Sequence, residues 1–299
     1  MAAWQLLKRG VVLDYVFCNL GGASHRLGAL RVMKVIADRW SYGSRPRLHA
    51  VDFEEVSREL QRSATPRYWQ VLLKRSMLRA AEAIARESGG CAIVTGEAVG
   101  QVSSQTLRNL ATISQATSMP ILRPLVGFNK DEIIEMANRI GTGPLSAVVA
   151  EYCAMVPRRP STSAKLDVVL EEESRTDPAV LETAIANREV LNLRGLDPDD
   201  SGLGDLERSE IPGGANVIDL RSQEEFRAWH YPDAVRLDFA HALEAYPSFA
   251  KDRTYLLYCE FGLKSAHLAE LMVRDGLRAY HFRGGIRAIR RYWEEHGRC

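Results

Sequence analysis

The sequence predicts a two-domain α/β protein in which buried strands alternate with helices in each half. Its 299 residues amount to about twice the usual size of one domain. Apolar runs without polar alternation, such as residues 11–20, are typical of strands buried on both faces of a parallel sheet. Helical patterns follow these runs, as expected for a doubly wound parallel sheet.

The first domain is expected to span residues 1–175. Its predicted strands are residues 11–20, 48–53, 91–95 and 121–125. Its predicted helices run from Ser24 to about Trp40, from Tyr68 to Glu87 and from Asn129 to Ile140, with a charged helical segment at 165–174. Gly89 and Gly141 are expected to end the second and third of these helices, because glycine adopts the left-handed cap conformation without steric cost.

Residues 176–212 are expected to form a linker, because the stretch 197–204 (DPDDSGLG) has the composition of one. A second domain is expected over residues 213–299, which is long enough to fold by itself. Its predicted strands are residues 217–220, 254–258 and 279–282, and its predicted helices are residues 224–230 and 265–275.

Composition excludes several classes of protein. Lys plus Arg total 39 and Asp plus Glu total 38, so the net charge of +1 argues against a chain whose whole surface binds nucleic acid, although a local basic patch remains open. No run approaches the roughly 18 apolar residues of a membrane span, and the N-terminus has no long apolar signal segment. We therefore expect no membrane association and a cytoplasmic location.

The five cysteines do not form a framework. They are widely spaced, their number is odd and no C-x-x-C pair occurs, so neither a disulfide scaffold nor a zinc site is predicted. Cys18 and Cys91 are expected to be packing residues, and Cys299 has no implied role.

Cys259 stands out by its surroundings. It follows a buried strand, with Gly262 and Ser265 behind it and a helix beginning there. Such a loop can turn its N–H groups toward one point, and the helix N-terminus adds positive potential, so a thiolate or persulfide is favoured. The alternative is a small buried cysteine at the end of a strand.

The most informative run of the first domain is residues 95–106 (TGEAVGQVSSQT), directly after a buried strand. This is where α/β folds place ligands, and Gly96 and Gly100 permit close approach of the backbone. Gln105 offers an amide to a base or a sugar. Lys74 and Arg75 are placed to reach a phosphate; the alternative is two solvated charges.

Four segments of the second domain carry recognisable motifs: residues 217–226 (VIDLRSQEEF), 232–235 (PDAV), 259–265 (CEFGLKS) and 282–286 (FRGGI). In this order they resemble the motifs of a rhodanese domain. The resemblance implies that Cys259 carries sulfur as a persulfide, with Asp219 and Arg221 supporting the loop.

Five segments of the first domain also match one family: residues 17–22 (FCNLGG), 73–81 (LKRSMLRAA), 95–107 (TGEAVGQVSSQTL), 122–125 (LRPL) and 151–153 (EYC). Together they resemble the tRNA 4-thiouridine synthetase (tRNA sulfurtransferase) family. Its adenylation domain is a PP-loop ATP pyrophosphatase, and its long form ends in a rhodanese domain. The predicted fold is therefore a partial PP-loop domain followed by a rhodanese-like α/β domain.

This resemblance implies ATP-dependent 4-thiolation of a tRNA uridine. ATP, with Mg²⁺ expected, adenylates the uridine, and a cysteine desulfurase loads sulfur onto Cys259. Cys153 then resolves the intermediate by forming a disulfide with Cys259, an exchange that requires the two thiols to meet. The linker would supply the reach, since about 35 flexible residues span on the order of 30 Å. Some members also supply sulfur for the thiazole of thiamine, which implies a sulfur-carrier protein as a further partner.

By match to the family, the nucleotide contacts Phe17, Cys18, Lys74, Gly96 and Gln105. Lys74 is expected to face phosphate, and the end of the first strand the adenine or ribose.

The family's S-G-G-x-D-S phosphate loop is absent from this sequence, and residues 2–10 resemble the end of the helix that follows it. We therefore expect an adenylation domain that lacks its first strand, that binds ATP weakly and that does not thiolate tRNA alone. Two other interpretations stay open: a persulfide relay without adenylation activity, and an inactive remnant.

Overall fold

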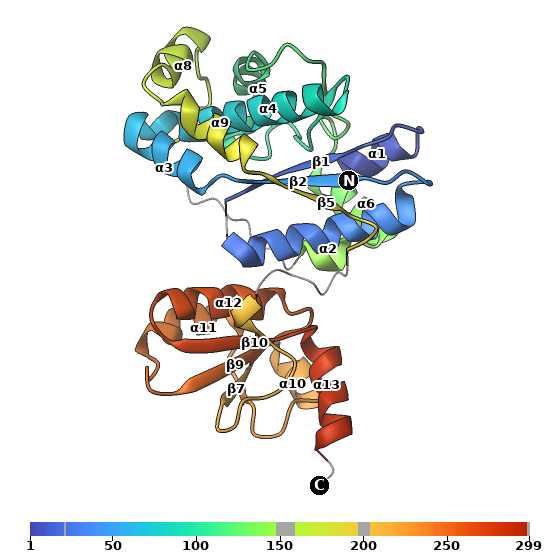
Figure 1. Ribbon diagram of the computed structural model, residues 1–299, viewed down its shortest axis with the longest axis vertical. Helices are drawn as coiled ribbons and strands as arrows, with labels where there is room; N and C mark the ends of the chain where they lie inside the picture. The colour runs from blue at the N-terminus through green and yellow to red at the C-terminus, as the bar shows by residue number, and fades with distance from the viewer. Residues whose placement is uncertain (21, 148–158, 197–203, 298–299) are drawn as a thin grey trace. The chain divides into compact units, whose positions relative to one another are not determined.

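The computed structural model describes residues 1–20, 22–147, 159–196 and 204–297 (Figure 1). These residues fold into two compact units, one built mainly from the chain up to Leu196 and the other mainly from Asp197 onward. The predicted α/β class is confirmed, because strands paired in parallel and helices occur in both units. None of the described helices combines the length and the apolar character that a membrane crossing requires.

The first unit alternates helices with short strands. Its strands are β1 (Tyr15–Asn19), β2 (Arg47–Asp52), β3 (Ile93–Val94), β4 (Ile121–Leu122) and β5 (Glu189–Asn192). Its helices are α1 (Ala2–Leu7), α2 (Gly22–Trp40), α3 (Glu54–Ser63), α4 (Trp69–Ser88), α5 (Leu107–Ser114), α6 (Lys130–Ile140), α7 (Gly143–Ser146), α8 (Leu166–Glu173) and α9 (Pro178–Ala186), with 3₁₀ turns at Pro66–Tyr68 and Ser103–Gln105. The predicted strands and helices of this half all occur, most of them with slightly shorter bounds.

Two sheets organise this unit among the described residues. In the first, β1 pairs in parallel with β2, with Tyr15 opposite Leu48, and β5 adds an antiparallel edge strand to β2. In the second, β3 pairs in parallel with β4. In Figure 1, α3, α4 and α9 lie on one side of the three-stranded sheet and α2 lies on the other. The antiparallel β5 is a departure from the all-parallel sheet expected.

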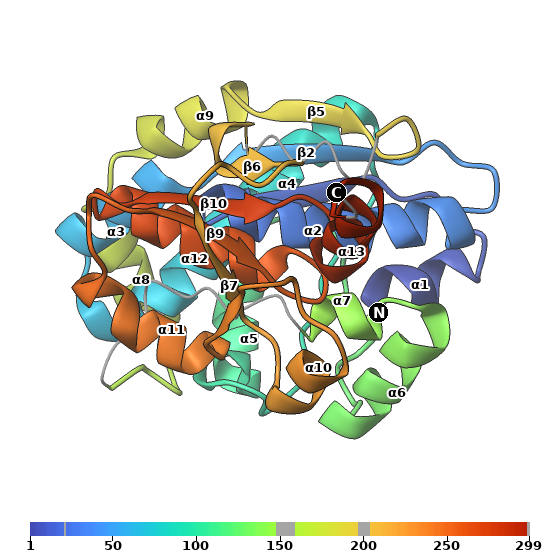
Figure 2. The ribbon, with the colours of Figure 1, turned by 90° about the horizontal axis from the view of Figure 1, so that it is seen from below.

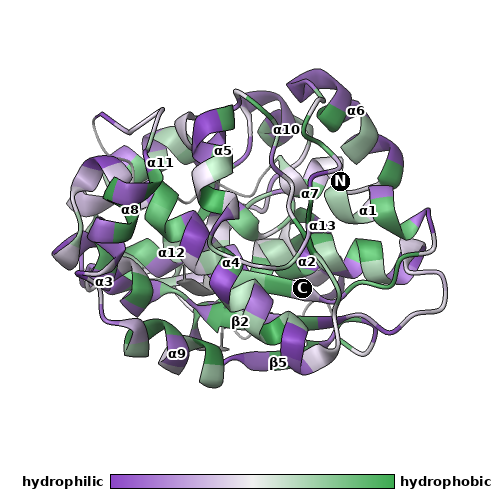
Figure 3. Cartoon of the chain, turned by 90° about the horizontal axis from the view of Figure 1, so that it is seen from above, coloured by the Kyte–Doolittle hydropathy of each residue, from purple (hydrophilic) through white to green (hydrophobic). Residues whose placement is uncertain are grey.

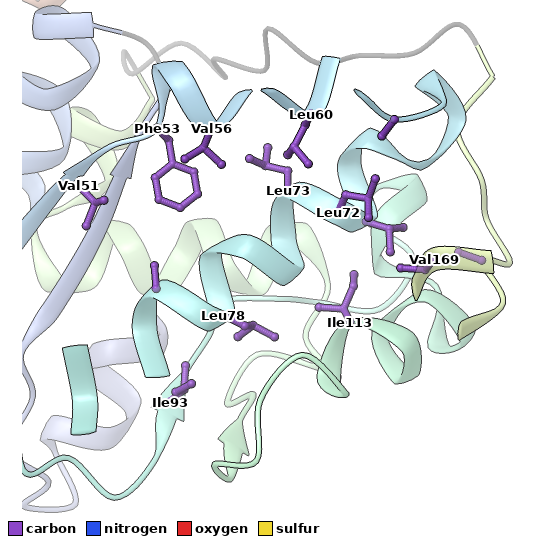
Figure 4. Close-up of a cluster of buried hydrophobic side chains, with 14 of the residues drawn as sticks. Val51, Phe53, Val56, Leu60, Leu72, Leu73, Leu78, Ile93, Ile113 and Val169 are labelled. Carbon is purple, nitrogen blue, oxygen red and sulfur yellow. The ribbon is translucent and has the colours of Figure 1, made fainter. Parts of the chain in front are cut away.

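The hydrophobic core of the first unit lies between α4 and its neighbours. Side chains from β2, α3, α4, α5 and α8 meet there (Figure 4). Val51 and Phe53 enter from the end of β2, and Leu72 and Leu78 from α4, while Ile93 brings in β3. Because α4 touches both β1 and β3, it fixes the positions of residues that follow either sheet.

Helix ends follow the local sequence. Asn129 caps α6 in a capping box with Glu132, and Gly141 ends it with a φ of 84°. Gly89 ends α4 in the same left-handed conformation, with a φ of 74°. Both glycine stops were predicted, because the left-handed cap is costly for residues with a Cβ.

The second unit is a parallel sheet covered on both faces. Its strands are β6 (Glu207–Arg208), β7 (Asn216–Asp219), β8 (Val235–Arg236), β9 (Thr254–Tyr258) and β10 (Arg278–Phe282), in the order β6-β10-β9-β7-β8. Figure 2 shows β6, β10, β9 and β7 in that succession. Its helices are α10 (Gln223–Ala228), α11 (Phe239–Ala245), α12 (Leu263–Arg274) and α13 (Gly285–His296), with 3₁₀ turns at Gly204–Leu206 and Tyr246–Ser248.

Alternate residues of the central strand β9 face opposite sides of this sheet. Tyr255 and Leu257 pack into the cluster that includes residues of α11 and α12. Leu256 and Tyr258 pack into the other cluster, with residues of α13. Since both faces are buried, β9 carries no charged residue and its sequence shows no alternation of apolar and charged positions.

The predicted linker of residues 176–212 is wrong over much of its length. Asp177 caps α9, Pro178 begins it, and its apolar side chains pack against the core of the first unit. The chain then forms β5, which pairs with β2 from Arg47 to Ala50. Only residues 197–203, which include most of the linker-like composition, lie outside the described part of this stretch. A flexible reach of about 35 residues is therefore not available.

Candidate active site

Cys259 directly follows β9, at the carboxyl end of the second unit's sheet. Ligands of open α/β sheets bind beyond the carboxyl ends of the strands. The Cys259 side chain belongs to the same cluster as Tyr255 and Leu257, and it is 4% exposed. We call residues 259–265 the cysteine loop. It leads from β9 into α12.

Ser265 lies across the loop from the thiol. Its hydroxyl donates to the carbonyl oxygen of Gly262 at 3.1 Å and lies 3.5 Å from Cys259 Sγ. In this orientation the hydroxyl oxygen can accept from the thiol, and after rotation it can donate to a thiolate. Gly262 caps α12 with a φ of 80°, a conformation that a residue with a Cβ adopts only with strain.

The N-terminus of α13 holds the outer side of the cysteine loop. The Ile286 N–H donates to the carbonyl of Cys259 at 2.9 Å and to that of Glu260 at 3.4 Å. In a trans peptide the N–H lies opposite the carbonyl, so the N–H groups of Glu260 and Phe261 point away from α13. Anchoring the two carbonyls on α13 therefore turns these N–H donors away from that helix.

Gly285 makes this close packing possible. A Cβ at this position would lie 2.6 Å from the carbonyl oxygen of Glu260, 2.7 Å from that of Cys259 and 2.9 Å from the nitrogen of Gly262. Its φ is also positive, at 66°. The second glycine of the Gly284-Gly285 pair is thus required by the backbone of the cysteine loop.

Asp219, Arg221 and Tyr258 form a buried polar network at the carboxyl ends of β7 and β9. Asp219 is fully buried and accepts from Arg221 Nε at 3.0 Å and from Nη2 at 2.7 Å, and Nη2 also donates to the Trp229 carbonyl. The Tyr258 hydroxyl accepts from the Tyr231 N–H at 3.1 Å. Burial and a hydrogen bond to Asp219 raise the pKa of Tyr258, so it stays neutral. The network joins the ends of β7 and β9, as expected for Asp219 and Arg221.

In the first unit, Lys74 is held by an acidic residue that the sequence analysis did not select. Its amine, on α4, donates to Glu97 Oε1 at 3.0 Å. Arg123 Nε donates to Glu97 Oε2 at 2.8 Å, and the Thr95 hydroxyl donates to the same oxygen at 3.1 Å. Burial raises the pKa of Glu97, but the charge of Lys74 and the hydrogen bonds from Arg123 and Lys74 outweigh it and lower the pKa. The ionised carboxylate therefore holds two cations side by side.

Lys74 remains accessible in this arrangement. Its side chain is 24% exposed, and Glu97 takes only one of its three N–H donors. A phosphate group can therefore still bind the amine.

The loop of residues 95–106, called here the nucleotide loop, has free space beside its glycines Gly96 and Gly100. A Cβ at Gly96 would meet only the Ala2 side chain, at 4.0 Å, and one at Gly100 would meet nothing. The Gly100 N–H donates to the Gln105 carbonyl at 3.1 Å, which closes the loop. Gln105 Oε1 is buried, and among the described residues no group donates to it. A ligand with an N–H donor would satisfy this oxygen.

The remaining predicted nucleotide residues, Phe17 and Cys18, lie on β1. Cys18 packs against the core beside α4, and burial raises the pKa of its thiol to about 12, so it is unreactive at neutral pH. Successive side chains of a strand point to opposite faces, so Phe17 faces away from Cys18. The structure thus groups Lys74, Gly96 and Gln105 around one loop, whereas Cys18, on β1, packs against the core beside α4.

Arg75 does not reach a phosphate site. It is 1% exposed and pairs with Glu173 of α8 through Nε at 2.7 Å and Nη2 at 3.0 Å. Successive residues of a helix point about 100° apart, which separates Arg75 from Lys74. Neither the phosphate contact nor a solvated charge is found; the residue is a buried structural cation.

The other cysteines differ from Cys259. Cys91 was expected in the core but is exposed, because it precedes β3, which contains only two residues. Cys153 and Cys299 lie outside the described residues. Within the described ranges, no group of three or more His, Cys, Asp or Glu side chains is placed to hold a metal ion.

Residues 1–177 match the family model described as Thiamine biosynthesis protein (ThiI), and residues 205–292 match the rhodanese-like domain. The chain belongs to the ThiI family. Proteins named tRNA sulfurtransferase are similar to this ThiI chain: one from Pyrobaculum aerophilum is 38% identical over 97% of the chain and 60% of the relative, and one from Marinobacter nauticus is 37% identical over 92% and 58%.

A solved structure is also similar to this ThiI chain. It is a crystal structure of a 4-thiouridine synthetase–RNA complex with bound ATP, 36% identical, with a TM-score of 0.57 over 64% of this chain and 51% of that one. The chain spans about 60% of the length of the relatives that it matches. Its ThiI region followed by a rhodanese-like domain agrees with the predicted fold.

Proposed function

We propose that this chain acts in tRNA sulfur transfer: Cys259 carries a persulfide, and the first unit binds the ATP that activates a tRNA uridine. The geometry of the cysteine loop is the observation that carries the proposal. A hydroxyl 3.5 Å from Sγ and a helix N-terminus both favour an anionic sulfur. The names of the similar proteins support the same reaction.

In the activation step, the uridine O4 attacks the α-phosphate of ATP, pyrophosphate leaves, and the base carries AMP. Lys74 and Arg123 would bind the phosphates, with Mg²⁺ accompanying the triphosphate. Gly96 lets the ligand approach the backbone, and the buried Gln105 Oε1 would accept from an amino group such as that of adenine. The open glycines and the unsatisfied acceptor fit a nucleotide.

In the sulfur step, the terminal sulfur of the Cys259 persulfide attacks C4 of the base and AMP leaves. The base is then joined to Cys259 by an S–S bond. The Cys153 thiolate attacks Cys259 Sγ, which forms a Cys153–Cys259 disulfide and releases the base as the thiocarbonyl. The sulfane sulfur gains two electrons and the two thiols lose them, so an external dithiol must reduce the disulfide before the next cycle.

The proposal implies partners beyond tRNA. A cysteine desulfurase would load sulfur onto Cys259, and a sulfur-carrier protein of thiamine synthesis would be a second acceptor. A reducing cytoplasm would keep both cysteines ready for the next cycle.

One observation favours a second candidate, a persulfide relay without adenylation. The cysteine loop is fully assembled, whereas Lys74 and Arg123 are both bound to the Glu97 carboxylate. In a relay, sulfur passes from the donor through Cys259 to another protein and no AMP forms.

Incubation with unmodified tRNA, ATP, cysteine and a cysteine desulfurase separates the two candidates. Formation of 4-thiouridine with release of equimolar AMP would establish the sulfurtransferase and would contradict the expectation that a domain without the S-G-G-x-D-S loop does not thiolate tRNA alone. Sulfur transfer from thiosulfate to cyanide without AMP formation would favour the relay. Absence of both activities, with the chain folded, would overturn both.

A further inference from the structure

Four exposed cations gather around one short segment of the first unit, outside the sites described above. Arg159 and Lys165 lie in the segment 159–165, which leads into α8. Arg67 adjoins this segment because its carbonyl accepts from the Ser161 N–H at 2.9 Å. Arg108, on α5, donates to the Ser163 hydroxyl at 3.1 Å. We call Arg67, Arg108, Arg159 and Lys165 the basic surface.

The charges of the basic surface are not neutralised. Among the described residues, none of these four side chains forms an ion pair with a carboxylate. Some exposed arginines elsewhere in the unit are paired, such as Arg58 with Glu54 and Glu55 and Arg62 with Glu59. Asp167, in the first turn of α8, is an exposed acidic group close to Lys165 in sequence. A local positive potential therefore remains although the whole chain is nearly neutral.

The segment that carries the basic surface is firmly fixed. Asn109 is fully buried and its amide donates to the carbonyls of Ser103 and Ser161, at 2.8 and 2.7 Å, while its oxygen accepts from the Ala164 N–H at 2.9 Å. The Thr106 hydroxyl donates to the Thr162 carbonyl at 2.7 Å. Because the frame is already ordered, ligand binding costs little conformational entropy.

The same bonds join the basic surface to the nucleotide loop. Ser103 and Thr106 belong to that loop, and Asn109 and Thr106 tie them to residues 161–164. Figure 3 shows hydrophilic residues on α5 and α8, the two helices next to the segment. A ligand that lies on the basic surface is therefore close to the candidate site of uridine activation.

The groups present favour RNA over an acidic protein. The Arg67 guanidinium lies over the Tyr68 ring, 5.3 Å from its centre, and a guanidinium plane can stack on an unpaired base. Thr162 and Ser163, two exposed residues with hydroxyl side chains, lie between Arg159 and Lys165 in the segment. Hydroxyl and guanidinium donors distributed along a strip suit the repeated phosphates of a nucleic-acid backbone.

We propose that the basic surface binds the phosphodiester backbone of RNA. That this RNA is tRNA rests on the proposed function. The surface then holds the nucleic acid while a nearby nucleotide is activated.

The test measures binding of a fluorescently labelled, unmodified tRNA transcript to the full chain at several salt concentrations, without ATP or a sulfur donor. The double variant Arg67→Gln/Arg108→Gln removes two phosphate contacts. Each contact contributes about 0.7 to 0.9 to the slope of log K against log[salt], so the magnitude of the slope should fall by about 1.4 to 1.8. Affinity at about 0.1 M salt should fall roughly tenfold or more.

A matched control is Arg58→Gln/Arg62→Gln on α3, which makes the same change of charge at paired arginines. It should leave slope and affinity unchanged. If the first pair impairs folding, Arg159→Gln/Lys165→Gln tests the same surface in a segment without regular secondary structure.

An unchanged slope in both basic-surface variants would overturn the proposal. So would equal competition by polyglutamate of the same total charge, because it would identify an acidic protein as the partner. A chain that binds RNA through this surface but makes no 4-thiouridine would contradict the proposed function and support the surface.

Discussion

Replacement of Gly285 by alanine tests the packing of α13 against the cysteine loop. The new Cβ would meet three backbone atoms at 2.6, 2.7 and 2.9 Å, none of which can move as a flexible side chain does. Overpacking of this kind costs about 1–3 kcal/mol. The positive φ of 66° adds about 1–2 kcal/mol for a residue with a Cβ. We expect a total loss of about 2–5 kcal/mol in the free energy of unfolding of the second unit.

Gly276→Ala is the matched control. This glycine has a φ of 85°, but a Cβ there would meet only Lys251 Nζ, at 3.8 Å. The control should therefore lose only the conformational cost of about 1–2 kcal/mol.

Urea unfolding, monitored by hydrogen exchange in peptides from β9 and β10, measures the loss of stability in each of the two variants. Sulfur transfer from thiosulfate to cyanide should be impaired in Gly285→Ala and preserved in Gly276→Ala, because only the former displaces the cysteine loop. Equal stability losses together with equal activity would refute the role assigned to Gly285.

Three further substitutions test other contacts, each by urea unfolding. Glu97→Gln leaves the half-buried cations Lys74 and Arg123 without an anion and should lower the free energy of unfolding by about 1–3 kcal/mol. The pKa of Glu97 is lowered from 4.5 in the folded state, so its carboxylate stabilises the fold above pH 4.5, and this stabilisation is lost as the pH falls below 4.5 through the lowered pKa. The difference in stability between variant and wild type should therefore disappear in acid. A gap of constant size in acid would contradict this. Asn109→Ala leaves two carbonyls and one N–H without their hydrogen-bond partner and should lower the free energy of unfolding by about 3 kcal/mol. Unchanged stability would show that these three hydrogen bonds do not fix the segment 159–165. Tyr258→Phe deprives the Tyr231 N–H of its acceptor and should cost about 1–3 kcal/mol while slowing sulfur transfer without abolishing it; unchanged stability would remove the hydroxyl from the network.

Most helices and strands could be predicted because the interactions that form them leave a signal in neighbouring residues of the sequence. The apolar run of β9 reflects burial on both faces, and the Asn129–Glu132 spacing encodes a capping box. The cysteine loop was also predictable, since strand, cysteine, glycine, serine and helix follow one another within a few residues.

Contacts between distant residues were not predictable from such signals. Glu97 accepts from Lys74 and Arg123, which lie 23 and 26 residues away along the chain. An acidic residue between two glycines of the nucleotide loop was the available hint, but only the fold shows which cations reach it.

The strand β5 shows the same limit for secondary structure. It has exposed residues at three of its four positions, so its sequence shows no buried face, and it exists because β2 offers it a partner. The helix α9 before it does have a local signal, an Asp177 cap followed by Pro178, within the stretch that was predicted to be a linker.

The mass of the intact chain after incubation with a cysteine desulfurase and cysteine, without reductant, tests the persulfide on Cys259 most directly. We expect an added mass of one sulfur atom, located on Cys259 by peptide mapping, removed by cyanide and absent from Cys259→Ala. No addition, or addition at the exposed Cys91 with Cys259 unmodified, would contradict the account.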